Sequence, residues 1–292
     1  MWPRPDDPAT VQRMRAAHAL AREPFHARPA PRGRQVWGWR GRTLGQPVIT
    51  AHGIAWLRLT SAPADQIIDT FWNGVIDAQR HIPASIPRPQ LRAWHDWTDQ
   101  PWAYRAELHD HVDARPVARR AILTTDPDLP QTWWAAVRTA LDNIAAVATN
   151  RVTLHNGFLA WAMPHYLGTP IDTTTPAAST AAHGDFHYAN LCGPDLRILD
   201  WEGWGNAPAG YDAAVLHCYS LLVPAVAARV RDELTDLLDT DTGRFAEIAA
   251  ITELLHTTTA GDNLKLARPL RRRAGQLLGR AVPAVRHRPA GY

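Results

Sequence analysis

Hydrophobic residues recur at helical spacing in several stretches of the chain. Apolar side chains repeat every three or four positions over residues 8–22, 64–80 and 129–148, as expected for amphipathic helices with one buried face. Residues 211–222 and 224–281 are rich in alanine and leucine and predict a bundle of further helices. Helices are therefore expected to dominate the second half of the chain.

Shorter segments with strand-like composition fall mainly in the first half. Three of them cover residues 35–39, 47–51 and 53–59, and a fourth covers residues 102–108. A short apolar strand is also expected at residues 196–199. The expected strands therefore gather in the first half of the chain and the expected helices in the second.

The length and composition suit one large domain or two lobes. The chain has 292 residues, of which 46% are hydrophobic. No apolar run reaches the roughly 18 residues expected of a membrane span. The first residues also lack the apolar core of a signal peptide. We therefore expect a cytoplasmic protein with no membrane partner.

Charge adds little to this description. The formal net charge is +3, and Lys265 is the only lysine, so nearly all the positive charge is arginine. The run Arg271-Arg272-Arg273 would suit nucleic acid, but it lies in a predicted helix, and acidic residues are nearly as numerous overall. A solvated helix face is the better interpretation, and no nucleic-acid partner is expected.

The most informative segment reads His-Gly-Asp-Phe-His-Tyr-Ala-Asn over residues 183–190, and Ile-Leu-Asp-Trp-Glu follows at 198–202. Phosphoryl transfer needs a carboxylate that orients the attacking hydroxyl and oxygen ligands that hold magnesium on the nucleotide. Asp185 suits the first role. Asn190 and Asp200 suit the second, because hard cations prefer carboxylate and amide oxygens.

This segment resembles the catalytic loop of the aminoglycoside phosphotransferase and choline kinase families. Their pattern is His-Gly-Asp-x-His-x-x-Asn, followed by an apolar run that ends in Asp-Trp-Glu. Residues 207–214 also resemble the "Pro-x-x-Tyr-Asp-Leu-Ala" element of these families. The resemblance implies a bilobal protein-kinase-like fold of the α+β class, with a small antiparallel-sheet N-lobe and a larger, mostly helical C-lobe. The N-lobe would cover residues 1–108, the hinge 109–116 and the C-lobe 117–292.

The same resemblance implies a role for each residue of the motif. Asp185 would be the base or hydroxyl-positioning residue, and Asn190 and Asp200 would bind Mg²⁺. The nucleotide would be ATP, with GTP as an alternative. Structural support would come from three further residues: His183, His187 and Asp212.

Nucleotide contacts are expected in the N-lobe and hinge. Residues 40–45 resemble a shortened phosphate-covering hairpin, in which Gly41 and Gly45 would let backbone amides approach phosphate oxygens. Any tight hairpin turn also favours glycine. In the hinge, backbone atoms would bind the nucleotide base at Leu108, His109 and His111. The close pair of histidines lacks the further ligands of a metal site.

The chain departs from the family at the strand that should carry a phosphate-binding lysine. Arg58 stands there instead, and the helix that follows has no glutamate, which leaves Asp69 and Asp77 as candidate partners that the spacing does not decide between. Arginine keeps its charge and offers a bidentate fork to phosphate. Three alternatives stay open: Arg58 binds the phosphates, Arg40 or Arg42 replaces it, or the N-lobe is degenerate.

The resemblance leaves the acceptor undefined. The first hypothesis is transfer of the γ-phosphoryl group to a hydroxyl of a small molecule, either aminoglycoside-like or another natural product. Ser or Thr in a natural-product peptide is an alternative acceptor. The alternative from another class is a pseudokinase-like protein that binds a nucleotide or ligand and assists a partner enzyme in a biosynthetic pathway. Eight acidic residues of the second half would either attract a polycationic sugar or form a solvated helix surface: Asp232, Glu233, Asp236, Asp239, Asp241, Glu247, Glu253 and Asp262.

Overall fold

The computed structural model describes residues 2–173 and 178–284. The chain forms two compact units. The first contains Met1–Arg115 and Arg197–Glu202, and the second contains Pro116–Leu196 and Gly203–Tyr292. The boundary after Arg115 falls within the segment predicted as a hinge.

The first unit is built on one antiparallel sheet. Its strand order is β1-β3-β4-β6-β5, and β2 also pairs with β3. The strands are β1 Arg28–Pro29, β2 Val36–Trp37, β3 Thr43–Thr50, β4 Gly53–Pro63, β5 Leu91–Asp99 and β6 Trp102–Asp110. Strand β6 lies between β4 and β5 and pairs with both.

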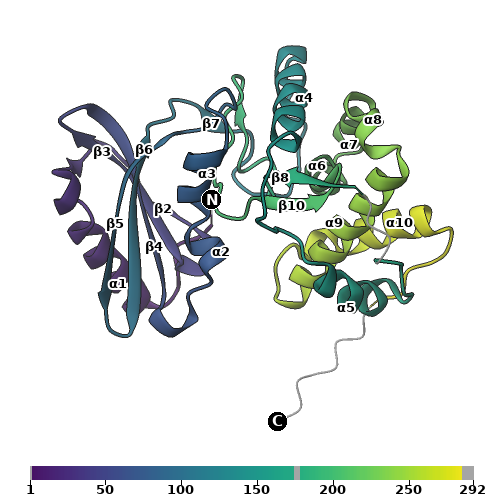
Figure 1. Ribbon diagram of the computed structural model, residues 1–292, viewed down its shortest axis with the longest axis horizontal. Coiled ribbons are helices and arrows are strands. Elements are labelled where there is room, and N and C mark those ends of the chain that lie inside the picture. The colour runs from purple at the N-terminus through teal and green to yellow at the C-terminus, as the bar shows by residue number, and fades with distance from the viewer. Residues whose placement is uncertain (1, 174–177, 285–292) are drawn as a thin grey trace, which may run out of the picture. The chain divides into compact units, whose positions relative to one another are not determined.

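One face of this sheet is apolar and packs against helix α1 (Pro8–Leu20). Asp7 caps the helix by accepting hydrogen bonds from the amides of Ala9 and Thr10. Alternate strand residues such as Leu57 and Leu59 are fully buried in the same cluster as the helix side chains. Figure 1 shows α1 along one side of the sheet. The intervening strand residues face the other side, because side chains alternate along a strand.

Two short helices, α2 (Asp69–Trp72) and α3 (Gly74–His81), lie on that other side of the sheet (Figure 1). The guanidinium of Arg88 donates to the carbonyls of Ala78 and Ile82 at the end of α3. The prediction of a single helix over residues 64–80 is therefore wrong, because a 3₁₀ turn, α2 and α3 cover this stretch instead.

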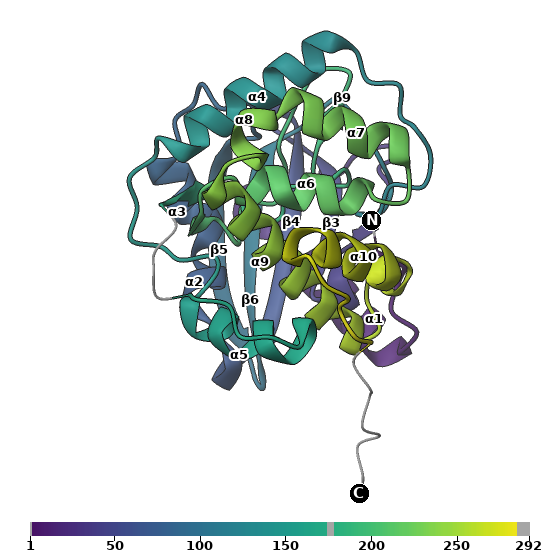
Figure 2. The ribbon, with the colours of Figure 1, turned by 90° about the vertical axis from the view of Figure 1, so that its right-hand side faces the viewer.

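The second unit is mostly helical. Its helices are α4 Gln131–Ala145, α5 Asn156–Leu167, α6 Tyr211–Ser220, α7 Pro224–Glu233, α8 Thr235–Leu238, α9 Asp241–Thr259 and α10 Ala267–Leu278. Helix α9 packs against α5, α6 and α10. Figure 2 shows α9 and α10 at the yellow-green end of the chain. Every residue of α6 is buried, so this helix forms the centre of the unit.

Four short strands complete the fold: β7 Arg115–Pro116, β8 Ser179–Ala182, β9 Cys192–Gly193 and β10 Gly205–Pro208. Strands β8 and β10 form an antiparallel pair that flanks the segment of residues 183–190 in sequence. The strand expected at residues 196–199 is wrong, since only an isolated bridge forms there, at Ile198. None of the helices in the described residues combines the length and the hydropathy needed to cross a membrane.

The predicted α+β class is confirmed. An antiparallel sheet makes up most of the first unit and helices make up the second, as the grouping of patterns in the sequence indicated. One difference is that Arg197–Glu202 packs with the first unit and not with the C-terminal lobe. The amide of Ile198 donates to the carbonyl of Pro87 at 2.7 Å, which holds this segment to the first unit.

Candidate active site

The segment of residues 183–190 is held by the first turn of α6. The Asp212 carboxylate accepts the amide of His183 at 2.6 Å and the amide of Gly184 at 2.9 Å. Burial raises the pKa of Asp212, although the charge of His183 and these two hydrogen bonds act in the opposite direction. Asp212 therefore fixes the first residues of the loop to α6.

Gly184 is fixed by sterics as well as by hydrogen bonding. Its φ is +88°, and a Cβ at this position would lie 2.4 Å from Oγ1 of Thr153. A larger residue would therefore be both strained and crowded. The loop thus turns sharply just before Asp185, whose amide donates to Nδ1 of His183 at 3.3 Å.

Asp185 is surrounded by groups that favour its ionised form. Nε2 of His187 lies 3.2 Å from Oδ1, and the Asn190 amide donates to Oδ2 at 2.9 Å. Burial alone would raise the pKa of Asp185, but the charge and hydrogen bond of His187, with help from His183 and Asn190, lower it to about 2. The Asp185 side chain is still 53% exposed, so the carboxylate is accessible.

Asn190 is oriented by the same loop. Its side-chain nitrogen donates to both the carbonyl and the carboxylate of Asp185, at 3.0 and 2.9 Å. The amide oxygen therefore points away from Asp185. An amide oxygen directed in this way is an appropriate ligand for Mg²⁺.

Asp200 belongs to the other unit, in the segment that packs with the sheet. Its φ is +63°, in the left-handed region that few residues other than glycine and asparagine or aspartate adopt. Its carboxylate lies 3.2 Å from the guanidinium of Arg58, and 41% of the side chain is exposed. An exposed carboxylate is the second kind of oxygen ligand that magnesium prefers.

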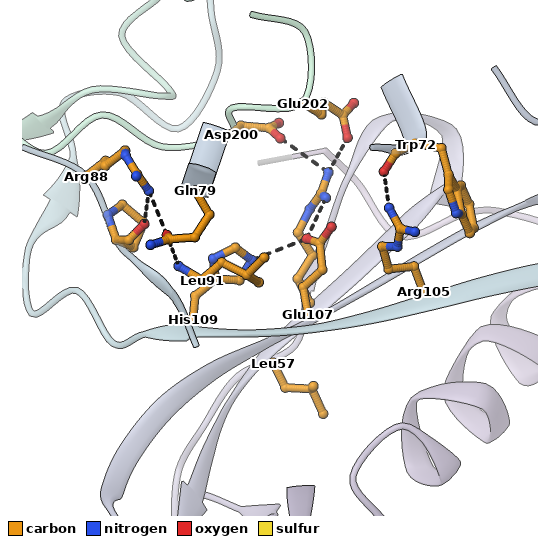
Figure 3. Close-up of polar contacts among 12 residues, drawn as sticks. Leu57, Trp72, Gln79, Arg88, Leu91, Arg105, Glu107, His109, Asp200 and Glu202 are labelled. Atoms are coloured by element: carbon orange, nitrogen blue, oxygen red, sulfur yellow. Dashed lines mark hydrogen bonds and ion pairs between the residues drawn. The ribbon is translucent and has the colours of Figure 1, made fainter. Parts of the chain in front are cut away.

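Arg58 is the centre of a network on the polar face of the sheet. It contacts Glu107 at 3.0 Å through one terminal nitrogen, and Glu202 at 2.5 Å and Asp200 at 3.2 Å through the other. Figure 3 shows Glu107, Asp200 and Glu202 turned toward the same guanidinium. Arg42 also donates to Glu202, at 3.1 Å. The network ties strands β4 and β6 to the segment Arg197–Glu202.

The charges of this network shift several pKa values. Burial alone would lower the pKa of Arg58, but the charges of Glu202, Glu107 and Asp200 outweigh it and raise the pKa. Burial raises the pKa of Glu202, and the charge of Asp200 acts in the same direction. The Arg58 guanidinium therefore remains charged, and it is the group that makes several nearby carboxylates tolerable.

Sequence reasoning missed Glu107. The predicted partners of Arg58 were Asp69, which begins α2, and Asp77, which lies in α3 near Arg80. Both predictions are wrong, because the acid that faces Arg58 is Glu107 of the neighbouring strand β6. The sequence did contain a signal, because Arg58 and Glu107 are each flanked directly by two apolar residues within a strand.

The two hairpin glycines have packing explanations. Gly41 has a φ of +75°, and a Cβ there would lie 2.4 Å from Cγ of Pro5. A Cβ on Gly45 would lie 2.4 Å from Cζ2 of Trp56, whose indole covers that position. Neither glycine therefore gives independent support for a phosphate-covering hairpin.

The hinge residues fall in two different environments. Leu108 and His109 lie within β6, which is paired with β4 on one side and β5 on the other. Their contacts with a nucleotide base stay a prediction. The His109 side chain directs Nε2 to Glu107 at 3.2 Å. His111 follows the end of the strand, and its contact with the base is likewise a prediction.

A second carboxylate lies near Asp185. Glu253 of α9 accepts a hydrogen bond from the hydroxyl of Tyr211. Burial raises its pKa to about 7, and the charge of Asp185 adds to this effect. Glu247 is different, because it is fully buried and paired with Arg273 at 2.6 Å. Of these two acids, only Glu253 belongs to the surroundings of the catalytic loop.

Among the described residues, no group of three or more His, Cys, Asp or Glu side chains is arranged to hold a metal. The predicted magnesium ligands are one carboxylate and one amide, and magnesium commonly retains several waters alongside one or two protein ligands. The chemistry of Asp200 and Asn190 therefore fits magnesium.

The same fold occurs in a solved kinase. The structure of a microcompartment-associated aminopropanol kinase aligns with a TM-score of 0.57 and 10% identity, over 90% of this chain and 98% of the kinase. The chain has the fold of this small-molecule kinase. The resemblance to kinases of small molecules, predicted from residues 183–202, is thereby confirmed at the level of the fold.

Two further structures align less closely. The crystal structure of a Ralstonia eutropha protein described as an aminoglycoside phosphotransferase has a TM-score of 0.48 and 14% identity, over 90% of this chain and 95% of its own. Spectinomycin phosphotransferase in complex with ADP and spectinomycin has a TM-score of 0.46 and 12% identity, over 82% of this chain and 88% of its own. No protein-family model matches the chain, and no curated protein matches its sequence.

Proposed function

We propose that the protein is an ATP-dependent phosphotransferase that transfers the γ-phosphoryl group to a hydroxyl of a small molecule. The observation that carries this proposal is the arrangement around Asp185: an accessible, ionised carboxylate on a loop braced by Asp212, in a chain with the fold of a small-molecule kinase. The proposed setting is the cytoplasm, where ATP is abundant.

Asp185 would orient the acceptor hydroxyl and receive its proton. The new bond forms between the acceptor oxygen and the γ-phosphorus, while the bond from that phosphorus to the β-phosphate oxygen breaks and ADP leaves. A carboxylate with a pKa of about 2 is a weak base. We infer that it orients the hydroxyl early and accepts the proton late, when the oxygen is already bonding to phosphorus and is more acidic.

Asn190 and Asp200 would hold magnesium through their side-chain oxygens. Magnesium, when bound, would neutralise charge on the phosphates of ATP. Arg58 supports the proposal because its charge is secured by the surrounding carboxylates, and a guanidinium binds phosphate well. GTP is the alternative nucleotide, since no described contact selects a base.

An acceptor screen with an ADP-coupled assay tests the proposal. Amino alcohols, aminoglycosides, nucleosides and Ser- or Thr-containing peptides would each be supplied with ATP and Mg²⁺. For an active acceptor, Asp185→Asn should lower turnover by roughly 10²- to 10⁴-fold, the usual contribution of a positioned base. Asp195→Asn is the matched control, because Asp195 is an exposed acid nearby in sequence. Equal turnover of the wild type and Asp185→Asn would refute the mechanism.

A second function is favoured by one observation. Both terminal nitrogens of Arg58 are occupied by carboxylates, a condition that also suits a protein that binds a nucleotide or another ligand without turnover and assists a partner enzyme. A thermal shift with ATP and Mg²⁺, but no turnover with any acceptor, would favour this alternative. Phosphorylation of a peptide Ser or Thr would instead change only the acceptor class.

A further inference from the structure

Arg58 and Glu107 face each other across the middle of the sheet. They are Cα partners in the register of β4 and β6, and their side chains meet at 3.0 Å. Only 15% of the Arg58 side chain and 2% of the Glu107 side chain are exposed. Burying such a pair costs desolvation energy, which a pair of apolar residues would avoid. The pair therefore calls for a reason beyond stability.

Glu107 is itself held in place from the same strand. His109 lies two residues along, on the same face of the sheet, and its Nε2 is 3.2 Å from the Glu107 oxygen that Arg58 also contacts. Burial would raise the pKa of Glu107, but Arg58 and His109 lower it to about 2. Glu107 is thus a permanent, immobile negative charge at physiological pH.

The other two carboxylates around Arg58 come from the segment Arg197–Glu202. They contact the second terminal nitrogen, whereas Glu107 alone contacts the first. Without Glu107, both terminal nitrogens would be drawn to Asp200 and Glu202. The guanidinium, which already lies 3.2 Å from Asp200, would then be drawn further toward the carboxylate that the proposed function assigns to magnesium.

We propose that Glu107 is a positioning residue that holds the Arg58 guanidinium for the phosphates of the nucleotide. This inference rests on the proposed function. The acid that anchors Arg58 is Glu107 of the neighbouring strand, and α3 contains no glutamate that takes this role. Glu107 acts only through Arg58 and has no contact of its own with the nucleotide.

Two explanations of Glu107 predict opposite changes in nucleotide affinity. If its charge acted directly, removing it would strengthen binding of a polyanion, since like charges repel. If it positions Arg58, removing it weakens binding. The sign of the change therefore separates the two, and a purely structural role would change thermal stability without changing the preference for phosphates.

The test is isothermal titration calorimetry with Mg·ATP and with adenosine, on the wild type, Glu107→Gln, Arg58→Gln and the double variant. Glu107→Gln should lower the affinity for Mg·ATP by about tenfold or more, as expected when one partner of a buried charge pair is removed. The affinity for adenosine should not change. In the Arg58→Gln background, Glu107→Gln should cause no further loss of Mg·ATP affinity.

A matched control is Asp96→Asn. Asp96 pairs with Arg105 between β5 and β6 of the same sheet, at 2.6 Å. Removing this acid should leave the ratio of Mg·ATP to adenosine affinity at the wild-type value. If Glu107→Gln does not fold, Glu107→Asp keeps the charge but shortens the side chain, and it should lower that ratio.

Three outcomes would overturn the inference. They are an unchanged or increased Mg·ATP affinity in Glu107→Gln, an equal loss of affinity for adenosine, and a further loss in the Arg58→Gln background. Failure of the proposed function has a different signature, because no acceptor would then be phosphorylated in the ADP-coupled screen, whatever the Mg·ATP affinities of these variants. Wild-type binding with an unaffected Glu107→Gln would refute the inference alone.

Discussion

At the scale of single residues, ionised groups buried beside opposite charges define both the candidate site and part of the core. The loop of residues 183–190 could be recognised from sequence because several fixed residue types lie at fixed spacing there. Glu107 could not be assigned in the same way, since its partner Arg58 lies 49 positions away and only the strand register brings the two together. Sequence spacing reveals local constellations, whereas cross-strand pairs require the register.

Glu247 should make the free energy of unfolding of the protein depend on pH in the acidic range. Burial opposes its ionisation, but hydrogen bonds from Arg273 and His217 outweigh this and lower its pKa from the ordinary 4.5 of a glutamate to about 2. A pKa depressed by folding contributes stability above the unfolded value, and that stability is lost as pH falls toward 2. The difference corresponds to about 3 kcal/mol.

Urea unfolding of the wild type, Glu247→Gln and Asp232→Asn between pH 2 and 7 checks this prediction. Glu247→Gln should be destabilised at pH 7, and its unfolding free energy should vary less with pH. Asp232 is exposed, so its variant should follow the wild type. Parallel pH profiles for all three proteins would contradict the role of Glu247.

Asp200 should be needed for activity but not for folding. Its positive φ suits glycine at least as well as aspartate, so Asp200→Gly should unfold within about 1 kcal/mol of the wild type. Asp200→Gly and Asp200→Asn should both lose Mg²⁺-dependent turnover. A magnesium titration of activity, beside thermal melts, measures both effects, and retained activity would remove Asp200 from the proposed site.

At the scale of secondary structure, elements with a clear apolar face were predictable. The periodic segments near residues 8–22 and 129–148 form α1 and α4, and the strands near 47–59 form β3 and β4. Strand β5 was missed because most of its residues are exposed, so its sequence lacks an apolar run. The helix expected over residues 64–80 breaks because tertiary contacts override the periodic pattern; Ile68, for example, is 62% exposed.

The first residue of α3 should be intolerant of any side chain. A Cβ on Gly74 would lie 1.9 Å from the carbonyl oxygen of Glu202, so the helix and the segment Arg197–Glu202 are in direct contact. Gly74→Ala should displace that segment and lower both phosphotransfer activity and the melting temperature of the protein.

Gly157→Ala is the control for Gly74→Ala. A Cβ at Gly157, in the first turn of α5, would meet no atom within 4 Å, and its φ is ordinary. Activity should be unchanged, and stability should rise by about 0.4–1 kcal/mol, as is usual for glycine replaced in a compatible conformation. Wild-type activity in Gly74→Ala would show that the segment can shift without consequence.

At the scale of the whole molecule, the chain leaves the first unit after Arg115, returns to it for Arg197–Glu202 and leaves again. The family resemblance implied a hinge at residues 109–116 and a C-lobe that ran without a break from residue 117 to residue 292. The return could not be predicted, because it depends on contacts such as the hydrogen bond between Ile198 and Pro87.

A fragment of residues 1–115 should therefore fold poorly. It would retain Arg58 and Glu107 but lose Asp200, Glu202 and the contact with Ile198. We expect poorly dispersed amide signals in its NMR spectrum, and recovery of dispersion when residues 194–204 are attached by a flexible linker. A well-dispersed spectrum for the unmodified fragment would show that the returning segment is dispensable.

The three acids gathered on one guanidinium make positions 58 and 107 interdependent. Arg58→Lys would replace a planar fork, which reaches Glu107 through one terminal nitrogen and Asp200 and Glu202 through the other, with a single compact ammonium. A point charge of this kind cannot span acids that approach from two sides in the same way. A change at either position therefore alters what the other position tolerates.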